Sequence, residues 1–198
     1  FGIFLKLIIS YFFSSDFTIK YFSPFVEYFV NTGFSNPYEE FSTNSFEIFP
    51  YPSLMLLILS IPRILFDFGG LSIATSSFLI KTPLLIADIT IFYVLKSLLN
   101  HRHTLRLIII YWFSPVLIYI SYIHGQLDII PISLVFVSLF FLFRNALYLS
   151  AIFLAFSIAT KTVIIAIIPI LIIFLVSQRL PWLKVIQFLT ITLISFFI

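Results

Sequence analysis

The string His124-Gly125-Gln126-Leu127-Asp128 places three side chains that can bond hydroxyl or phosphate groups within five residues. Gly125 permits a tight turn at this point, where one apolar run ends and another starts. Asp128 could simply cap the following helix, with Pro131 in its first turn. That role leaves His124 and Gln126 unexplained, so the string predicts a functional cluster. A lone His–Asp pair provides too few ligands to predict a metal site.

Three of the carboxylates that precede this string are candidates for chemistry at a water–membrane edge or in an exposed loop. Asp16 follows the apolar run Phe1–Phe13, and at a water–membrane edge it could act as a general base toward an acceptor hydroxyl. It could equally cap a short helix, as could Ser14 and Ser15. Glu39 and Glu40 follow a turn signal, and paired carboxylates can bind a divalent cation or sugar hydroxyls. Adjacent acids in an exposed loop are more often simply solvated.

Lysines and one aspartate lie within or beside apolar runs. We expect Lys81-Thr82-Pro83 to open a helix on which Asp88, two turns later, shares a face with Lys81. An acid inside a membrane span is costly and indicates function, although pairing with a neighbouring helix would be a structural alternative. Lys81 is placed for a phosphate at the membrane surface or for snorkelling to that surface.

The composition indicates the class of protein to which these side chains belong. Of 198 residues, 61% are apolar and only 10% are charged, and the mean hydropathy is +1.16. Soluble domains carry about 25% charged residues, so we expect an all-α integral membrane protein, a polytopic helical bundle. The chain has no cysteine, which excludes disulfides. The absence of a basic cluster with interleaved aromatics argues against nucleic acid.

Eight apolar runs define the expected helices: 1–13, 54–66, 83–95, 107–123, 129–143, 146–159, 163–176 and 185–198. With flanking residues, 82–99 and 105–122 approach the length of about 20 residues that a span needs. The short pieces 146–159 and 163–176 meet at Lys161 and are typical of a broken or re-entrant pair whose junction faces protein or water. Because residue 1 is Phe and the last run stops within apolar sequence, we expect 1–198 to be a single membrane domain from a longer protein.

Charges separate along the chain. The positive-inside rule assigns seven basic residues to the cytoplasmic side: Lys6, Lys96, Arg102, Arg106, Arg144, Arg179 and Lys184. The other side then receives seven acids, Asp16, Glu27, Glu39, Glu40, Glu47, Asp67 and Asp128, and four bases, Lys20, Arg63, Lys81 and Lys161. Residues 14–80 become one large external loop in which Leu54–Phe66 lies on or dips into the membrane. A competing layout makes Leu54–Phe66 a true span and exports the basic loop.

The order of these features resembles membrane glycosyltransferases of the GT-C fold, in particular the prokaryotic branch that uses polyprenyl-phosphate sugars. It is similar to the mannosyltransferases of GPI-anchor synthesis and the glucosyltransferases of the N-glycan pathway. The matching features are Ser15-Asp16, Gly33 before Pro37-Tyr38, Phe49-Pro50-Tyr51-Pro52, Lys81-x-Pro83 with Ala87-Asp88, the His-Gly-Gln-x-Asp turn and Ala159-Thr160-Lys161. Together they cover most of the chain. Thr18 stands where some relatives carry the second acid of an Asp-x-Asp.

The resemblance implies transfer of a hexose of the mannose or glucose class to a lipid or glycan acceptor on the non-cytoplasmic face, with inversion. It places the general base on Asp16, phosphate contacts on Lys81, Lys161 and Arg63, and the sugar or phosphate pocket at His124, Gln126 and Asp128. A divalent cation is the one cofactor it leaves open. The resemblance also implies juxtamembrane helices in the first external loop and localisation in a prokaryotic plasma membrane.

Two other classes of protein fit the composition. A polytopic transporter or lipid flippase would use Asp88, His124 and Lys161 as an ion or substrate pathway, and it would contain broken helices. No repeat symmetry between the halves is visible, and the acidic first loop has no role in that reading. The third class is a structural membrane subunit without activity. No G-x-S-x-G, P-loop or H-E-x-x-H occurs, so other enzyme classes have no motif here.

Overall fold

A computed structural model of the chain describes residues 2–43, 49–66, 71–99 and 103–197. Glu47, Asp67 and Arg102 lie outside these ranges. The sides of the membrane assigned to the charged residues remain predictions. In the described residues every regular element is a helix, which confirms the all-α prediction. The elements are α1 (Gly2–Phe12), η1 (Thr18–Phe22), α2 (Ser23–Asn31), α3 (Pro37–Thr43), α4 (Ser53–Phe66), α5 (Ile73–Leu98), α6 (Thr104–Leu107), η3 (Ile108–Trp112), α7 (Pro115–Ile118), η4 (Tyr119–Ile123), α8 (Ile129–Phe143), α9 (Leu147–Thr160), η5 (Thr162–Ile167), α10 (Ile168–Ser177) and α11 (Trp182–Phe196).

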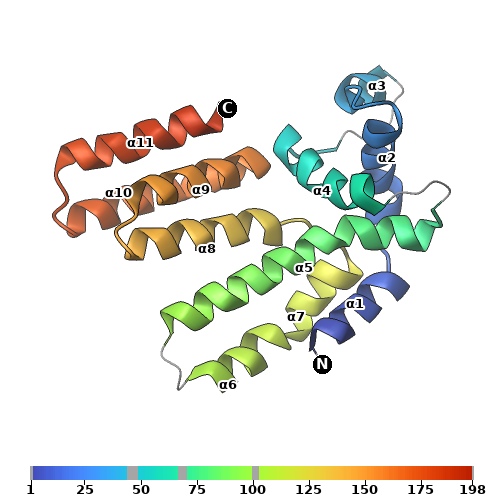
Figure 1. Cartoon of the computed structure of the whole chain (residues 1–198), viewed down its shortest axis with the longest axis horizontal. Helices are drawn as coiled ribbons and strands as arrows, with labels where there is room; N and C mark the ends of the chain where they lie inside the picture. Colours follow the sequence, from blue (N-terminus) through green and yellow to red (C-terminus); the bar gives the residue numbers. More distant parts are fainter. Residues whose placement is uncertain (1, 44–48, 67–70, 100–102, 198) are drawn as a thin grey trace.

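Helix α5, the longest helix in the described residues, runs obliquely through the middle of the molecule (Figure 1). It begins at Ile73, where the Ser72 side chain accepts a hydrogen bond from the Thr75 N–H. The prediction that Lys81-Thr82-Pro83 opens this helix is therefore wrong, because Pro83 lies inside it. Pro83 has no N–H to donate to the preceding turn. In that turn the Thr82 hydroxyl donates to the Phe78 carbonyl at 3.2 Å.

Helix α5 is also the one element in the described part of the chain that is long and apolar enough by itself to cross a membrane. Its 26 residues reach about 39 Å at 1.5 Å per residue, against roughly 30 Å of bilayer hydrocarbon. The region expected as a span at 105–122 is a pair, Thr104–Trp112 and Pro115–Ile123, which together are long and apolar enough to cross a membrane but are bent by 45° at the break between them. The second half starts afresh at Pro115, and the Ser114 side chain accepts from the Leu117 N–H.

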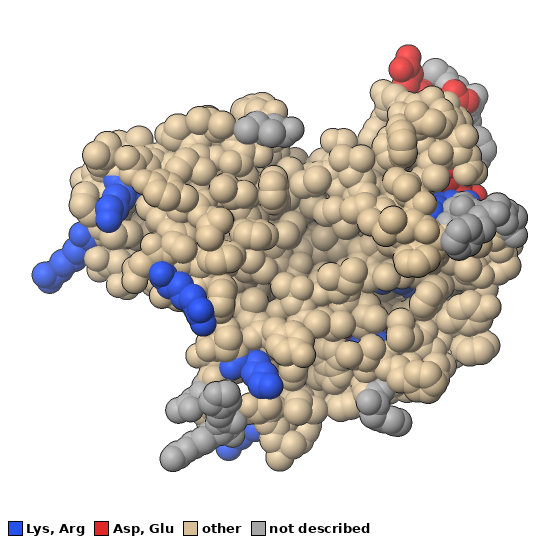
Figure 2. Space-filling view, viewed as in Figure 1, with Lys and Arg blue, Asp and Glu red and all other residues tan. Residues whose placement is uncertain are grey.

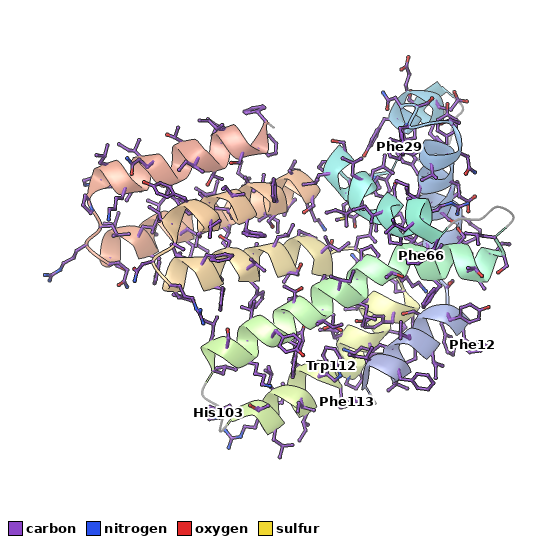
Figure 3. The ribbon with its side chains drawn as sticks, viewed as in Figure 1. Phe12, Phe29, Phe66, His103, Trp112 and Phe113 are labelled. Carbon is purple, nitrogen blue, oxygen red and sulfur yellow. The ribbon has the colours of Figure 1, made fainter. Side chains whose placement is uncertain are left out.

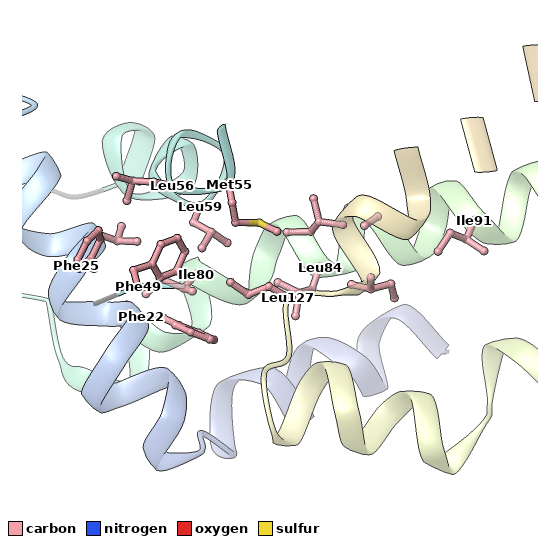
Figure 4. Packing of buried hydrophobic residues seen from close by; sticks show 14 residues of the cluster. Phe22, Phe25, Phe49, Met55, Leu56, Leu59, Ile80, Leu84, Ile91 and Leu127 are labelled. Atoms are coloured by element: carbon pink, nitrogen blue, oxygen red, sulfur yellow. The ribbon is translucent and has the colours of Figure 1, made fainter. Parts of the chain in front are cut away.

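The segment 14–80 contains α2, α3 and α4, which agrees with helices inside the predicted external loop. Helix α4 has 14 residues, about 21 Å, so it is too short to cross a bilayer unaided. It packs on α2, α5 and α9. The core of this part joins Phe22 and Phe25, Phe49, the inner face of α4, the first half of α5 and the start of α8 (Figure 4).

A second buried cluster is formed by α8, α9, α10 and α11. The chain reverses at Lys161, whose backbone is extended (φ −154°, ψ 108°). As a result α9 and α10 lie in the same half of the molecule (Figure 1). The predicted break at Lys161 is thus present. The clusters meet where α8 packs on α5 and α9 packs on α4.

Charged side chains gather at opposite ends of this arrangement. Figure 2 shows Lys and Arg along the end where α5, α8 and α10 finish, and acids at the far end over α3. The polarity predicted from the sequence is therefore visible in the fold. Lys6 departs from it, because its side chain is fully buried against Asp88 rather than placed with the basic ends.

Candidate functional site

The turn between η4 and α8 carries the cluster predicted from sequence. Its Gly125 has φ +76°, a left-handed conformation that side chains other than glycine rarely adopt. A Cβ there would lie 2.3 Å from the Thr18 Oγ1. The close approach of η1 therefore requires glycine at this position and brings the turn against the segment that follows α1.

That segment contains Asp16. The Ser15 hydroxyl donates to the His124 carbonyl at 2.5 Å and accepts weakly from the Thr18 N–H at 3.3 Å, so Ser15 performs the capping role for which Asp16 was an alternative. The rings of Phe17 and His124 lie 5.9 Å apart. Two predicted site segments, joined by residues 109 positions apart in sequence, are thus in direct contact.

Asp16 itself points to solvent. Its side chain is 80% exposed and accepts a hydrogen bond at 2.7 Å from Lys20, one turn later. This hydrogen bond and the charge of Asp16 raise the pKa of Lys20. The carboxylate is therefore accessible, with a cation beside it, at the edge of the contact between Phe17 and His124.

Asp128 does not cap α8 with its side chain. Its carboxylate instead pairs with the Lys161 ammonium and accepts from the Gln126 amide at 3.3 Å. The Lys161 Nζ lies 5.6 Å from the centroid of the Tyr51 ring. Burial and the neighbouring Asp128 raise the pKa of Tyr51 to about 12. Asp128, Gln126 and Lys161 therefore form one partly exposed group around Tyr51.

Two hollows meet at this group. The first, about 180 Å³, is lined by Phe17, Phe22, Tyr51, His124, Gly125 and Gln126. The second is a larger, mainly apolar groove of about 550 Å³ between α5, the α7–η4 helix and α8, and it includes Gln126 and Asp128 in its wall. Gln126 lines both, so the amide separates an aromatic pocket from an apolar groove.

Lys81 and Asp88 lie elsewhere, in the buried junction of α1, α5 and η4. The Lys81 ammonium donates to the carbonyls of Phe13 and Tyr122 and is 1% exposed. Asp88 is fully buried, pairs with Lys6 at 2.6 Å and accepts from the Tyr122 hydroxyl. Helix α5 thus turns both residues inward, as their common face predicted, but toward protein groups rather than the pocket.

Around this junction, Trp112 covers the Lys6 ammonium at 3.6 Å from the ring centroid. Trp112 and Phe113 lie near the start of α1 (Figure 3). A Cβ on Gly2 would lie 2.1 Å from the Trp112 Nε1, so the beginning of α1 fits tightly against η3. The junction is packed and closed, which fits a structural pairing of Asp88 better than an open pathway.

The remaining predicted residues lie outside the group around Tyr51. Arg63 is buried and donates to Glu27 at 2.9 Å and to Ser76 at 2.6 Å, which ties α4 to α2 and α5. Glu39 and Glu40 lie in the first turn of α3, where acids favour the helix dipole. Helix α3 reaches the site indirectly, since the Tyr38 hydroxyl donates to the Tyr51 carbonyl at 2.6 Å. The roles of these three residues in substrate binding remain predictions.

Sequence reasoning did not identify Phe17, Phe22 and Tyr51 as pocket residues, nor Tyr122 as the partner of Asp88. In a chain with 27 Phe and 10 Tyr, an aromatic residue carries no signal of its own. The one available clue was the Phe49-Pro50-Tyr51-Pro52 string, whose prolines fix the backbone around Tyr51.

Within the described residues no group of three or more His, Asp or Glu side chains could hold a metal ion. No family model matches this chain, and neither a curated protein nor a solved structure matches it. The function must therefore be argued from the geometry above.

Proposed function

We propose that this protein is a multi-pass membrane glycosyltransferase that moves a hexose from a polyprenyl-phosphate donor to an acceptor on the non-cytoplasmic face. The observation that carries the proposal is the position of Gln126, which lines both the aromatic pocket and the apolar groove. A lipid-linked sugar has the same two parts. Its chain fits the groove, and its sugar fits a pocket of aromatic faces with amide and imidazole groups.

Placement in a membrane is supported by α5 and by the shorter apolar helices around it. Many large apolar side chains face outward, including Ile110, Ile173 and Leu193 at 73%, 70% and 59% exposure. Water would penalise such a surface, at about 25 cal/mol per Å² of apolar area, whereas lipid would not. The basic ends of the helices then face the cytoplasm, and the group around Tyr51 faces outward.

The donor phosphate needs a cation that can reach it. Lys81 is occupied by buried carbonyls, and Arg63 is engaged by Glu27 and Ser76. The Lys161 side chain is 29% exposed and pairs with Asp128, which lines the groove. We therefore assign Lys161 to the phosphate, with Asp128 holding it in place before the donor binds.

In the reaction, Asp16 takes the proton of the acceptor hydroxyl as its oxygen attacks the anomeric carbon. The bond from that carbon to the phosphate oxygen breaks, and polyprenyl phosphate leaves with the electron pair, stabilised by Lys161. Attack on the face opposite the phosphate inverts the anomeric centre. His124 and Gln126 orient the sugar by hydrogen bonds.

The test uses the full-length protein in nanodiscs with radiolabelled polyprenyl-phosphate mannose or glucose and measures release of polyprenyl phosphate. We expect Asp16→Asn to lower kcat by about 10²–10⁴-fold, the usual contribution of a general base, and Asp16→Glu to restore part of it. Lys161→Gln should lower kcat, because the leaving phosphate loses its cation, and should raise KM, whereas Lys184→Gln, at the opposite end of the molecule, should change neither constant. Unchanged turnover in Asp16→Asn would exclude that residue as the base. Transport of a labelled lipid without any release of polyprenyl phosphate would instead support the flippase alternative.

A further inference from the structure

The segment that carries Asp16 and the turn that carries His124 both emerge from helix ends. Helix α1 ends at Phe12 and η4 at Ile123, so unpaired carbonyls from two C-termini point into the same buried space. Each helix C-terminus carries partial negative charge. These two ends would repel each other unless a cation lay between them.

Lys81 is that cation. Its ammonium donates to the carbonyl of Phe13 and, at 3.1 Å, to the carbonyl of Tyr122, and it lies 3.3 Å from the Ser14 hydroxyl. An ammonium has three protons to donate, and with the Ser10 carbonyl at 3.5 Å it has four acceptors within reach, so none of its protons lacks a partner. Its Cε lies 3.5 Å from where a Cβ of Gly125 would be, so the aliphatic part of the lysine side chain also packs against the turn.

Further contacts act on the same pair of segments. The Ser15 hydroxyl bonds the His124 carbonyl at 2.5 Å, and Thr18 closes against Gly125. These contacts fix the backbone on either side of Asp16 relative to the backbone on either side of His124. Neither Lys81 nor Ser15 is among the residues that line the pocket.

We propose that Lys81 is a positioning residue that fastens the segment bearing Asp16 to the turn bearing His124, and that Ser15 assists it. The chemistry is the joint neutralisation of two helix C-termini by one buried ammonium. The role rests on the proposed function for its catalytic consequence. Its geometric consequence, a fixed separation of the two segments, does not depend on any reaction.

The geometric test uses the absence of natural cysteine. Spin labels on Lys20→Cys and Tyr119→Cys, at positions with 63% and 58% exposure, report the separation of the two segments by electron paramagnetic resonance. We expect one narrow distance distribution in the parent chain and in Lys96→Met, a matched loss of a lysine from the last turn of the same helix. Lys81→Met should broaden the distribution. A distribution as narrow as that of the parent would overturn the proposal.

The kinetic test separates positioning from direct binding. Displacing a reacting group by about 1 Å can cost 10²-fold in rate, so we expect Lys81→Met to lower kcat about a hundredfold with KM little changed. Lys81→Arg, which keeps charge and donors, should recover part of that loss. A raised KM with unchanged kcat would show instead that Lys81 binds the phosphate and would overturn the proposal.

If Lys81→Met does not fold, Ser15→Ala provides the test, because it removes the bond to the His124 carbonyl and the weak bond from the Thr18 N–H but no charge. We expect a broader label distribution and a smaller fall in kcat, and an unchanged distribution would count against the proposal. If the parent protein released no polyprenyl phosphate from the sugar donor, the proposed function would be refuted. The label distances would still confirm or refute the fastening role.

Discussion

The helical bundle α8–α11 and the junction of α1, α5 and η4 bury polar groups in opposite ways. In the bundle, the interhelical hydrogen bonds come from hydroxyls. Ser138 donates to the Ser150 carbonyl at 2.8 Å, Ser157 to the Pro131 carbonyl at 2.7 Å and Thr192 to the Ala151 carbonyl at 3.4 Å. In the junction, three charged side chains, Lys6, Asp88 and Lys81, are at most 1% exposed.

This difference indicates that the junction fixes the relative positions of its helices, whereas the bundle is held together mainly by packing. Burying two charges costs about as much as their attraction returns, so a buried ion pair is a weak source of stability. Its loss on one side is nevertheless costly, because the remaining charge has no partner. We infer that the junction fixes how α1 meets η4, while the bundle serves as a packed support for Asp128 and Lys161.

The largest expected effect comes from breaking the junction on one side. Asp88→Leu leaves the Lys6 ammonium buried without its carboxylate, and the free energy of unfolding should fall by about 3–5 kcal/mol. Adding Lys6→Met removes the orphaned charge and should recover most of that loss. The measurement is denaturant unfolding in detergent micelles. A double variant as unstable as Asp88→Leu alone would show that the pair is a net source of stability.

Lys20→Met is the matched control for this experiment. It breaks an ion pair of similar length, 2.7 Å, but both of its side chains are more than half exposed. Exposed pairs contribute little to stability, so we expect no measurable change in unfolding. A large effect of Lys20→Met on the free energy of unfolding would mean that the Asp16–Lys20 ion pair, rather than Ser15 and Lys81, holds the segment at Asp16.

The second effect concerns the turn that the junction supports. Gly125→Ala adds a methyl group 2.3 Å from the Thr18 Oγ1 at φ +76°. We expect the free energy of unfolding to fall by about 3 kcal/mol. About 1–2 kcal/mol comes from placing a side chain on left-handed backbone, and about 1–3 kcal/mol comes from the steric overlap. Gly33→Ala separates the two costs, because Gly33 has φ +69° and nothing within 4 Å of its Cβ. Equal losses in the two variants would show that the contact with Thr18 is loose.

The sequence predicted several features of the fold. Composition and apolar runs gave the all-helical class, the break at Lys161 and the separation of basic from acidic ends. The spacing of Lys81 and Asp88 gave their common face. These features are local, since each depends on helical periodicity or on a change of composition along a few residues.

Three features could not be predicted in this way. The pairing of Lys6 with Asp88 joins residues 82 positions apart, and no local pattern encodes that distance. The proline at position 83 was a misleading signal for a helix start, because α5 already begins at Ile73, capped by Ser72, and continues through Pro83. Among so many aromatic residues, the pocket wall at Tyr51 becomes visible only when α8 and η1 are placed beside it.

A smaller effect tests the bundle. Ser157→Ala removes the hydroxyl that joins α9 to the Pro131 carbonyl of α8, and interhelical hydrogen bonds in membranes contribute about 0.6 kcal/mol on average. We expect a loss of about that size in the same unfolding experiment. Ser177→Ala, whose hydroxyl bonds within its own helix in an exposed position, should have no measurable effect. A loss from Ser157→Ala as large as that from Asp88→Leu would remove the contrast between the two regions.

The smallest expected change in stability at neutral pH comes from replacing a tyrosine beside the site. Burial raises the pKa of Tyr38 and of Tyr51 to about 12 from 10.0, with Asp128 adding to the shift of Tyr51. A raised pKa means that the folded state favours the protonated phenol. This contribution to stability is therefore complete below pH 10 and is lost as the pH rises from 10 to 12. We expect Tyr51→Phe to leave stability at pH 7 nearly unchanged and to make its decline above pH 10 shallower. The check is unfolding at a series of alkaline pH values, and a decline as steep in Tyr51→Phe as in the parent would show that Tyr51 ionises freely and that the pocket wall beside Asp128 is open to water.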